Sequence, residues 1–164
     1  MIFTTKAEYG VRLLIQLGVQ GGTDPVSLKS VAAAENLPLA YLERIAALLK
    51  KAGLITSTRG AHGGYVLAAP AGEITMDRVV LALEGAIAPM ECFIDEAATT
   101  DTRVACTHHD DTSQHCATKL LWTRVQLGVI KSLQRTTLAE LVAFQQAGLT
   151  PPPEHELETS SSHG

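Results

Sequence analysis

The sequence predicts a mainly α-helical fold, a winged helix-turn-helix followed by a long C-terminal helix. Two segments with the apolar spacing of a helix, Leu28 to about Glu35 and one that starts near Leu39, are separated only by Asn36-Leu37-Pro38. Pro38 cannot continue a helix but can begin the next one, which predicts a tight turn. Two strand-like runs follow directly, and the glycine-rich stretch Gly60–Gly64 between them predicts a hairpin tip.

Capping signals mark the other helices. Thr5 and Glu8 have the spacing of a capping box, with Thr5 at the N-cap of the first helix. Thr75 is placed to cap a later helix. The apolar periodicity of residues 119–134 predicts a long helix, and Thr137 begins a last helix with a second capping box.

Composition limits the class of protein. With 46% hydrophobic and 18% charged residues, the 164-residue chain is expected to bury one compact core. No apolar run approaches the roughly 18 residues of a membrane span, and the N-terminus lacks a signal-peptide pattern, so we expect a cytoplasmic protein without a membrane partner. The net charge of −4 hides an asymmetry, because the balance is +3 in residues 1–64 and −7 in residues 65–164. The basic part is the one suited to nucleic acid.

We expect four regions along the chain. They are a winged-helix DNA-binding domain (1–85), a cysteine-bearing loop (86–118), a long helix with a terminal helix (119–148) and a disordered tail (149–164). The long helix is apolar over much of its surface. It either covers the core of its own chain or forms the interface of a homodimer, and we favour the dimer because DNA-reading winged helices commonly act in symmetric pairs.

The helix that starts near Leu39 carries a candidate DNA-reading face. Tyr41, Glu43 and Arg44, with Ala40 beside them, stand opposite its apolar side. In a major groove, Tyr41 can contact phosphate, sugar or a thymine methyl group, and Glu43 can accept a hydrogen bond from a cytosine amino group. Taken singly, each of these side chains could equally belong to a solvated helix face.

Two more basic residues complete the expected contacts with double-stranded DNA. Arg59 is expected at the base of the hairpin, placed to reach a minor groove, where arginine recognises narrow A·T-rich geometry. Lys29, on the first helix of the helix-turn-helix, is the second basic residue expected to contact DNA. The order of helix, turn, helix and glycine-rich hairpin with Arg59 predicts DNA binding more strongly than any one of these residues.

All three cysteines of the chain, Cys92, Cys106 and Cys116, lie in one polar segment. An odd number of cysteines in a reducing compartment favours metal ligation or redox chemistry over structural disulfides. Three thiolates leave a coordination vacancy on either an iron–sulfur cluster or a tetrahedral Zn²⁺ ion, and their spacing fits no CxxC zinc finger. The alternative is three unrelated surface thiols, which is a poor match to a residue type that is normally buried.

The stretch LAYLERIAALLKKAGLITSTRGAHGGYVLA, Leu39 to Ala68, resembles the recognition helix and wing of the IscR-type iron–sulfur cluster regulators. That winged-helix family includes nitric-oxide-sensing repressors. The resemblance continues through MDRVVLALEG (76–85) and TTLAEL (136–141) and covers about the first 145 residues. It implies that the protein is a transcriptional regulator and not an enzyme. Such a regulator would bind a pseudo-palindromic operator as a homodimer and hold a [2Fe-2S] or [4Fe-4S] cluster.

The resemblance also implies a ligand set. The three cysteines match the ligating cysteines of the family, although the intervals between them are longer than is usual there. Some members add a histidine shortly after the last cysteine, but Lys119 stands at that position here. Others use an acidic residue of the first helix that reaches across the dimer, which here is Glu8. Histidines within the cysteine-bearing segment remain alternative fourth ligands: His108, His109 and His115.

Two other functions compete with a cluster-controlled regulator. The same DNA-binding scaffold could instead use Zn²⁺ or reversible disulfide formation in the cysteine segment. A winged helix can also serve only as a protein-interaction module, which would show no salt-dependent DNA affinity. An enzyme is disfavoured because the sequence has no HExxH motif and no zinc-deaminase pattern.

Overall fold

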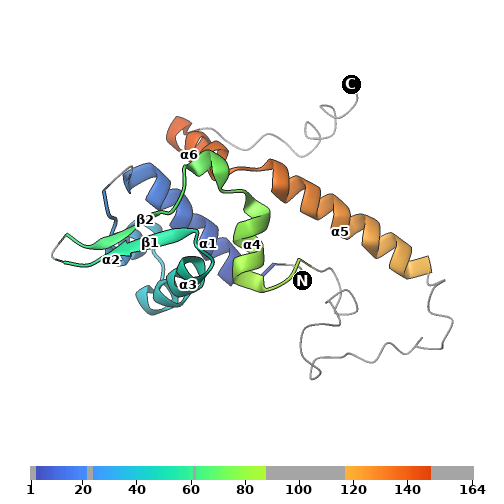
Figure 1. Cartoon of the computed structure of the whole chain (residues 1–164), viewed down its shortest axis with the longest axis horizontal. Helices are drawn as coiled ribbons and strands as arrows, with labels where there is room; N and C mark the ends of the chain where they lie inside the picture. Colours follow the sequence, from blue (N-terminus) through green and yellow to red (C-terminus); the bar gives the residue numbers. More distant parts are fainter. Residues whose placement is uncertain (1–2, 22–23, 61, 88–116, 149–164) are drawn as a thin grey trace.

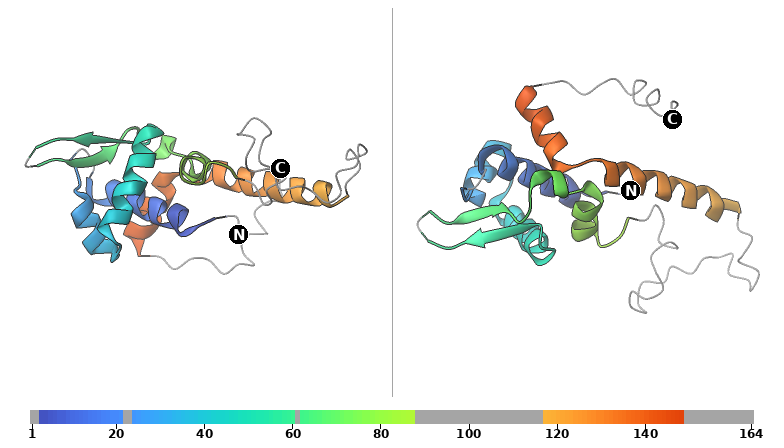
Figure 2. Two further views of the ribbon diagram at one scale, coloured as in Figure 1. Left: turned by 90° about the horizontal axis from the view of Figure 1, so that it is seen from below. Right: turned by 45° about the horizontal axis from the view of Figure 1, so that its top comes forward.

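The computed structural model describes residues 3–21, 24–60, 62–87 and 117–148. It confirms a mainly α-helical winged helix-turn-helix with a long C-terminal helix (Figure 1). The elements are α1 (Thr5–Gln16), η1 (Leu17–Gly21), α2 (Leu28–Glu35), α3 (Leu39–Lys51), β1 (Ile55–Thr58), β2 (Gly64–Leu67), η2 (Ala71–Glu73), α4 (Met76–Glu84), α5 (Ala117–Arg135) and α6 (Leu138–Ala147). The β1–β2 hairpin projects from the bundle of α1 to α4, while α5 runs away from that bundle (Figure 2). The expected tail, 149–164, lies outside the described residues.

The helix-turn-helix forms as its capping residues predict. The Ser27 hydroxyl oxygen caps α2 by accepting a hydrogen bond from the N–H of Ser30 at 3.0 Å. α2 ends at Asn36, whose backbone is left-handed with φ 53°, a conformation that asparagine tolerates better than most residues. Pro38 then stands at the N-cap of α3, which confirms the predicted turn.

The wing is an antiparallel hairpin in which Ile55 pairs with Leu67 and Thr58 pairs with Gly64. The segment before α2 joins it, because Val26 and Tyr65 exchange two backbone hydrogen bonds of 2.9 and 2.8 Å. Gly64 was expected in the hairpin tip but is the first residue of β2. A Cβ atom at Gly64 would lie 2.5 Å from the Val26 carbonyl oxygen, so this close backbone approach requires glycine.

The predicted capping box of the first helix is wrong. The N-cap is Thr4, whose backbone is extended and whose hydroxyl oxygen accepts from the Lys6 N–H at 3.2 Å. Thr5 is already helical. The carboxylate at this helix start comes from α4 instead of from Glu8, because the Thr4 N–H and hydroxyl both donate to Glu84 Oε1, at 3.1 and 2.6 Å. α1 ends at Gln16 and continues as the π-helical η1.

α1 supplies the centre of the hydrophobic core. Leu13 and Leu14 are completely buried, and each buried leucine contributes about 1.5–3 kcal/mol to folding. Gly10 lets α1 approach α4 closely, because a Cβ atom there would overlap the side chain of Leu83. Other core side chains come from α3, α4 and α6: Leu42, Ile45, Leu49, Val79 and Leu138.

Backbone hydrogen bonds fasten the start of α6 to the start of α4. The Met76 N–H donates to the Thr136 carbonyl oxygen at 3.0 Å, and the Leu138 N–H donates to the Ile74 carbonyl oxygen at 2.8 Å. Thr137 is the N-cap of α6, as its sequence predicts. The C-terminal helices are therefore anchored to the bundle at this junction.

α5 contacts α4 but leaves much of its own apolar surface uncovered. The Gln126 side-chain amide donates to the Ile87 carbonyl oxygen at 2.8 Å, just beyond the end of α4. Leu120, Leu121 and Leu127 are 58, 55 and 51% exposed in this single chain. Three leucines that are more than half exposed on one helix are unusual for a surface that faces only water.

Replacing Gly10 by alanine is expected to lower the free energy of unfolding by about 1–3 kcal/mol, because the new methyl group forces α1 away from the buried Leu83 side chain. Urea denaturation followed by circular dichroism measures this change. The control is Gly72→Ala in η2, where an added Cβ atom meets nothing within 4 Å. Equal stability of G10A and G72A would contradict the described α1–α4 spacing.

The Glu84 contact with Thr4 predicts a pH dependence. Burial by itself raises the pKa of Glu84, but the hydrogen bonds from Thr4 and the nearby Lys6 charge hold that pKa below its ordinary value of 4.5. Folding therefore favours the carboxylate, so Glu84 contributes stability above pH 4.5 that is lost as the pH falls through the lowered pKa.

We expect Glu84→Gln to be less stable than the wild type by about 1 kcal/mol near neutral pH, and the difference to shrink in acid. Urea denaturation at a series of pH values measures it. Glu73→Gln, at an exposed residue of η2, is the control and should keep the wild-type pH profile. A constant difference between E84Q and wild type at all pH values would contradict the assignment.

Candidate nucleic-acid interface

The exposed face of α3 contains most of the side chains predicted to read DNA. Ala40, Glu43 and Arg44 are all exposed. Tyr41 is half-buried, because its ring meets the ring of Tyr9 edge to face with centroids 5.6 Å apart. Only part of Tyr41 is therefore accessible to a ligand, and the sequence of α3 alone did not indicate this contact with α1.

Arg59 is exposed, but it does not lie at the base of the wing, where it was expected. It follows β1 directly, beyond the Thr58–Gly64 pair, so it begins the turn at the far end of the hairpin and does not stand at the base. The strand ends there because Gly60, with φ 124°, starts the chain reversal. His62 is exposed in the same turn. The far end of the wing thus projects an arginine away from the bundle.

A hydrogen bond that the sequence did not indicate connects α3 with the wing. Lys50 Nζ, in the last turn of α3, donates to the Ser57 hydroxyl oxygen of β1 at 2.6 Å. Both residues are exposed. The end of α3 and the first strand of the wing are therefore joined by a charge-assisted hydrogen bond as well as by the chain itself.

The segment that forms α2, α3 and the wing carries a net positive charge. Residues 28–67 contain five basic and two acidic residues, a net charge of +3 in a chain whose total is −4. All five basic side chains are exposed, and none forms an ion pair within the part of the chain that the structure describes: Lys29, Arg44, Lys50, Lys51 and Arg59. Exposed cations without an anionic partner provide the sequence-independent attraction that DNA phosphates require.

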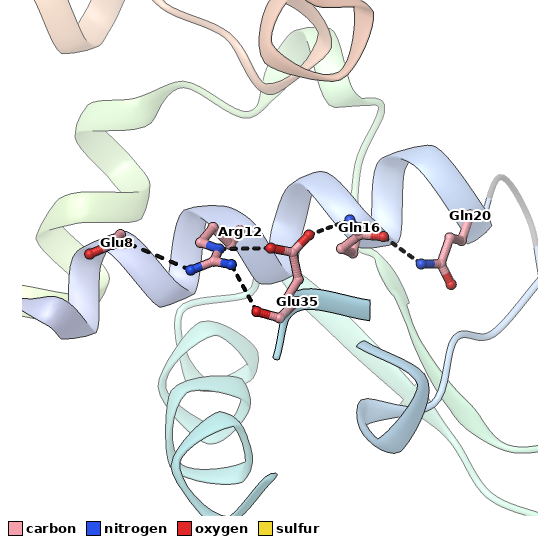
Figure 3. Close-up of polar contacts among 5 residues, drawn as sticks. All are labelled: Glu8, Arg12, Gln16, Gln20 and Glu35. Atoms are coloured by element: carbon pink, nitrogen blue, oxygen red, sulfur yellow. Dashed lines mark hydrogen bonds and ion pairs between the residues drawn. The ribbon is translucent and has the colours of Figure 1, made fainter. Parts of the chain in front are cut away.

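A network of polar side chains joins α1 to the end of α2 (Figure 3). Arg12 Nε donates to Glu35 Oε2 at 2.7 Å, and Arg12 Nη2 donates to the Glu35 carbonyl oxygen at 2.8 Å. The Gln16 amide donates to the other Glu35 carboxylate oxygen, and the Gln20 amide donates to Gln16 Oε1. Gln16 is 7% exposed, so it is a buried polar residue whose hydrogen bonds are satisfied by this network.

Glu8 is the one predicted cluster ligand that the structure describes. Its side chain is 63% exposed, and its oxygen lies 3.6 Å from Arg12 Nη1. The predicted ligands Cys92, Cys106 and Cys116 lie outside the described residues, as do His108, His109 and His115. Among the residues that are described, no group of three or more metal-binding side chains comes together. The ligand set therefore stays a prediction.

Comparison with known proteins identifies the family of this winged helix. Residues 3–144 match the Rrf2 family, described as iron-dependent transcriptional regulators. The chain belongs to the Rrf2 family. It is accordingly a DNA-binding transcriptional regulator and not an enzyme.

Similar proteins cover nearly the whole of this Rrf2-family chain. The protein rrf2 of Nitratidesulfovibrio vulgaris is 38% identical over 151 residues, which are 92% of each sequence. The structure of CymR, the global cysteine regulator of B. subtilis, is 35% identical with a TM-score of 0.69 and covers 88% of this chain and 98% of that one. The structure of T. potens IscR is 28% identical with a TM-score of 0.67 and covers 95% of this chain and 96% of that one.

These matches confirm the resemblance to the IscR-type regulators that the sequence indicated. They also show a likeness to CymR, which the sequence motifs alone did not indicate. None of the helices described for this Rrf2-family protein combines the length and the hydrophobicity of a membrane-spanning segment.

Proposed function

We propose that the protein binds a double-stranded DNA operator through α3 and the wing. Glu43, Arg44 and the accessible part of Tyr41 would enter a major groove, because an α-helix fits that groove and can present these groups to base edges. Arg59 would reach the adjacent minor groove from the far end of the wing, and Lys29 would contact backbone phosphate. The observation that carries this proposal is the net positive charge of residues 28–67, whose basic side chains are all exposed.

The same proposal includes a homodimer on a pseudo-palindromic operator. The exposed leucines of α5 support it, since burial against a second copy would remove about 25 cal/mol of unfavourable hydration per Å² of apolar surface. A symmetric pair of α3 helices can contact two half-sites about one helical turn apart.

We propose further that an iron–sulfur cluster, [2Fe-2S] or [4Fe-4S], controls operator affinity. Cys92, Cys106 and Cys116 would hold it through their thiolates, with Glu8 as the fourth ligand. The donor chemistry fits, because thiolates are the usual cluster ligands and the Glu8 carboxylate is exposed and free of the helix cap. A bound cluster would supply a centre that reacts with oxidants and nitric oxide. The description of the Rrf2 family as iron-dependent supports the proposal.

A regulator that uses Zn²⁺ or a thiol–disulfide switch is the second candidate. It is favoured by the likeness to CymR, whose B. subtilis structure is 35% identical to this chain against 28% for T. potens IscR. A structure of Staphylococcus aureus CymR, 36% identical, is of an oxidized form. In this case two thiols would form a disulfide on oxidation and be restored by a reducing thiol.

Anaerobic purification followed by visible spectroscopy and assays of iron and acid-labile sulfide separates the two candidates. A brown protein with matched iron and sulfide supports the cluster. A colourless protein after anaerobic reconstitution with iron and sulfide contradicts the cluster and supports the zinc or thiol switch, because Zn²⁺ and thiols do not absorb visible light.

Cys106→Ala is expected to abolish the bound iron and sulfide, because two thiolates and a carboxylate cannot hold the cluster as stably as the full set. Iron and sulfide content per chain measures the loss, and circular dichroism checks that the variant folds. Thr107→Ala, at the neighbouring residue, is the control and should retain the wild-type content. Normal iron in C106A would remove Cys106 from the ligand set.

Arg59→Gln is expected to weaken operator binding roughly tenfold while leaving iron content unchanged, because the wing contacts DNA and not the cluster. Fluorescence anisotropy with a duplex selected by the wild-type protein measures the affinity. Arg78→Gln in α4 is the control with the same change in charge. Loss of iron in R59Q would contradict the separation of the wing from the cluster site.

A further inference from the structure

Glu35 is the residue at which α2 ends and the turn to α3 begins. Asn36 is left-handed, the Leu37 N–H donates to the Ala32 carbonyl oxygen at 3.0 Å, and α3 starts after one more residue. The last carbonyl groups of a helix have no donor within that helix. Arg12 of α1 supplies a donor for the Glu35 carbonyl oxygen at 2.8 Å and holds the Glu35 carboxylate at 2.7 Å. One guanidinium group therefore fixes the turn of the helix-turn-helix relative to α1.

The same guanidinium group is connected to the first turn of α3. The Arg12 guanidinium carbon lies 5.9 Å from the centroid of the Tyr9 ring. Tyr9 in turn meets Tyr41 of α3 edge to face at 5.6 Å, an arrangement preferred by aromatic pairs. α3 is thus held by α1 at the turn before it and at its own first turn. Arg12 makes the first of these contacts and lies over the Tyr9 ring that makes the second.

We propose that Arg12 is a positioning residue for DNA recognition, which sets the orientation of α3 without contacting DNA. The proposal rests on the proposed use of α3 as the DNA-reading helix. Two of the three guanidinium nitrogens, Nε and Nη2, donate to Glu35 within the chain (Figure 3). The side chain of Glu35 is only 14% exposed, so its contact with Arg12 is shielded from most of the surrounding water.

Arginine is required at this position by geometry as well as by charge. Its planar fork donates to the Glu35 carboxylate and to the Glu35 carbonyl oxygen at the same time. A lysine at position 12 would keep the charge but would carry it on one nitrogen, which lacks the fixed fork. Arg12→Lys therefore loosens the turn while leaving the net charge and the long-range attraction to DNA unchanged.

The first measurement is DNA affinity by fluorescence anisotropy, with a duplex enriched from a random library by the wild-type protein and a duplex of unrelated sequence. We expect R12Q and R12K to lose fivefold to thirtyfold, roughly, in affinity for the selected duplex, because base contacts depend on the orientation of α3. Affinity for the unrelated duplex and its salt dependence should stay near wild type in R12K. Arg78→Gln removes an exposed arginine that also donates to a backbone carbonyl oxygen, that of Glu73, and should match wild type on the selected duplex.

The second measurement is amide hydrogen exchange, which needs no DNA. We expect faster exchange at Leu37 in R12K, with unchanged exchange in β1 and β2. If R12Q fails to fold, R12K decides both measurements. Selected-duplex affinity within twofold of wild type in R12K, or unchanged exchange at Leu37, overturns the proposal. Equal loss on both duplexes with a smaller salt dependence also overturns it, because Arg12 would then contact phosphate.

Arg44→Gln distinguishes failure of this inference from failure of the proposed function. Arg44 is exposed on α3 and should weaken binding to the selected duplex whether or not Arg12 positions the helix. Wild-type affinity in R44Q would contradict the DNA-reading face of α3 itself. Weaker binding in R44Q with wild-type binding in R12K would instead leave that face in place and overturn only the role of Arg12.

Discussion

α1 contacts α2, α3, α4 and α6, so the position of this one helix decides where each of the others can lie. Small residues allow the close approaches. Gly10 accommodates Leu83 of α4, and a Cβ atom at Gly18 of η1 would lie 2.6 Å from Val142 Cγ2 of α6. Because Leu13 and Leu14 are buried within the same helix, a shift of α1 would disturb the core as well as the DNA-binding elements. The fold therefore depends on one helix that the proposed DNA surface does not include.

Local chemistry explains which parts of the fold the sequence could predict. Ser27 accepts a hydrogen bond three residues away, Pro38 restricts its own backbone, and Gly60 permits a reversal, so each acts within a few residues of its place in the chain. The first helix cap was misplaced because its carboxylate comes from Glu84, eighty positions away from Thr4. No pattern in the first helix could indicate that partner.

In the candidate site, too, features set by the local sequence could be predicted and those set by distant side chains could not. Exposure of Lys29, Glu43 and Arg44 could be predicted, because each lies opposite the apolar positions of an amphipathic helix. The partial burial of Tyr41 and the Glu35 contact could not, since both depend on side chains of α1. The sequence places all three cysteines in one segment, but their arrangement lies outside the described residues, so their shared role stays a prediction.

The backbone bridge between Val26 and Tyr65 joins the wing to the segment that leads into the helix-turn-helix. Its consequence is evolutionary. A freely hinged hairpin could change its DNA contacts by itself, but here the backbone bridge joins the wing to the segment before α2. Under the proposed mode of binding, a change of operator would have to conserve the distance between the two groove contacts, while the bases at each contact stay open to substitution. Operators recognised by related regulators would then differ in which bases occupy a half-site, while the length of the half-site stays the same.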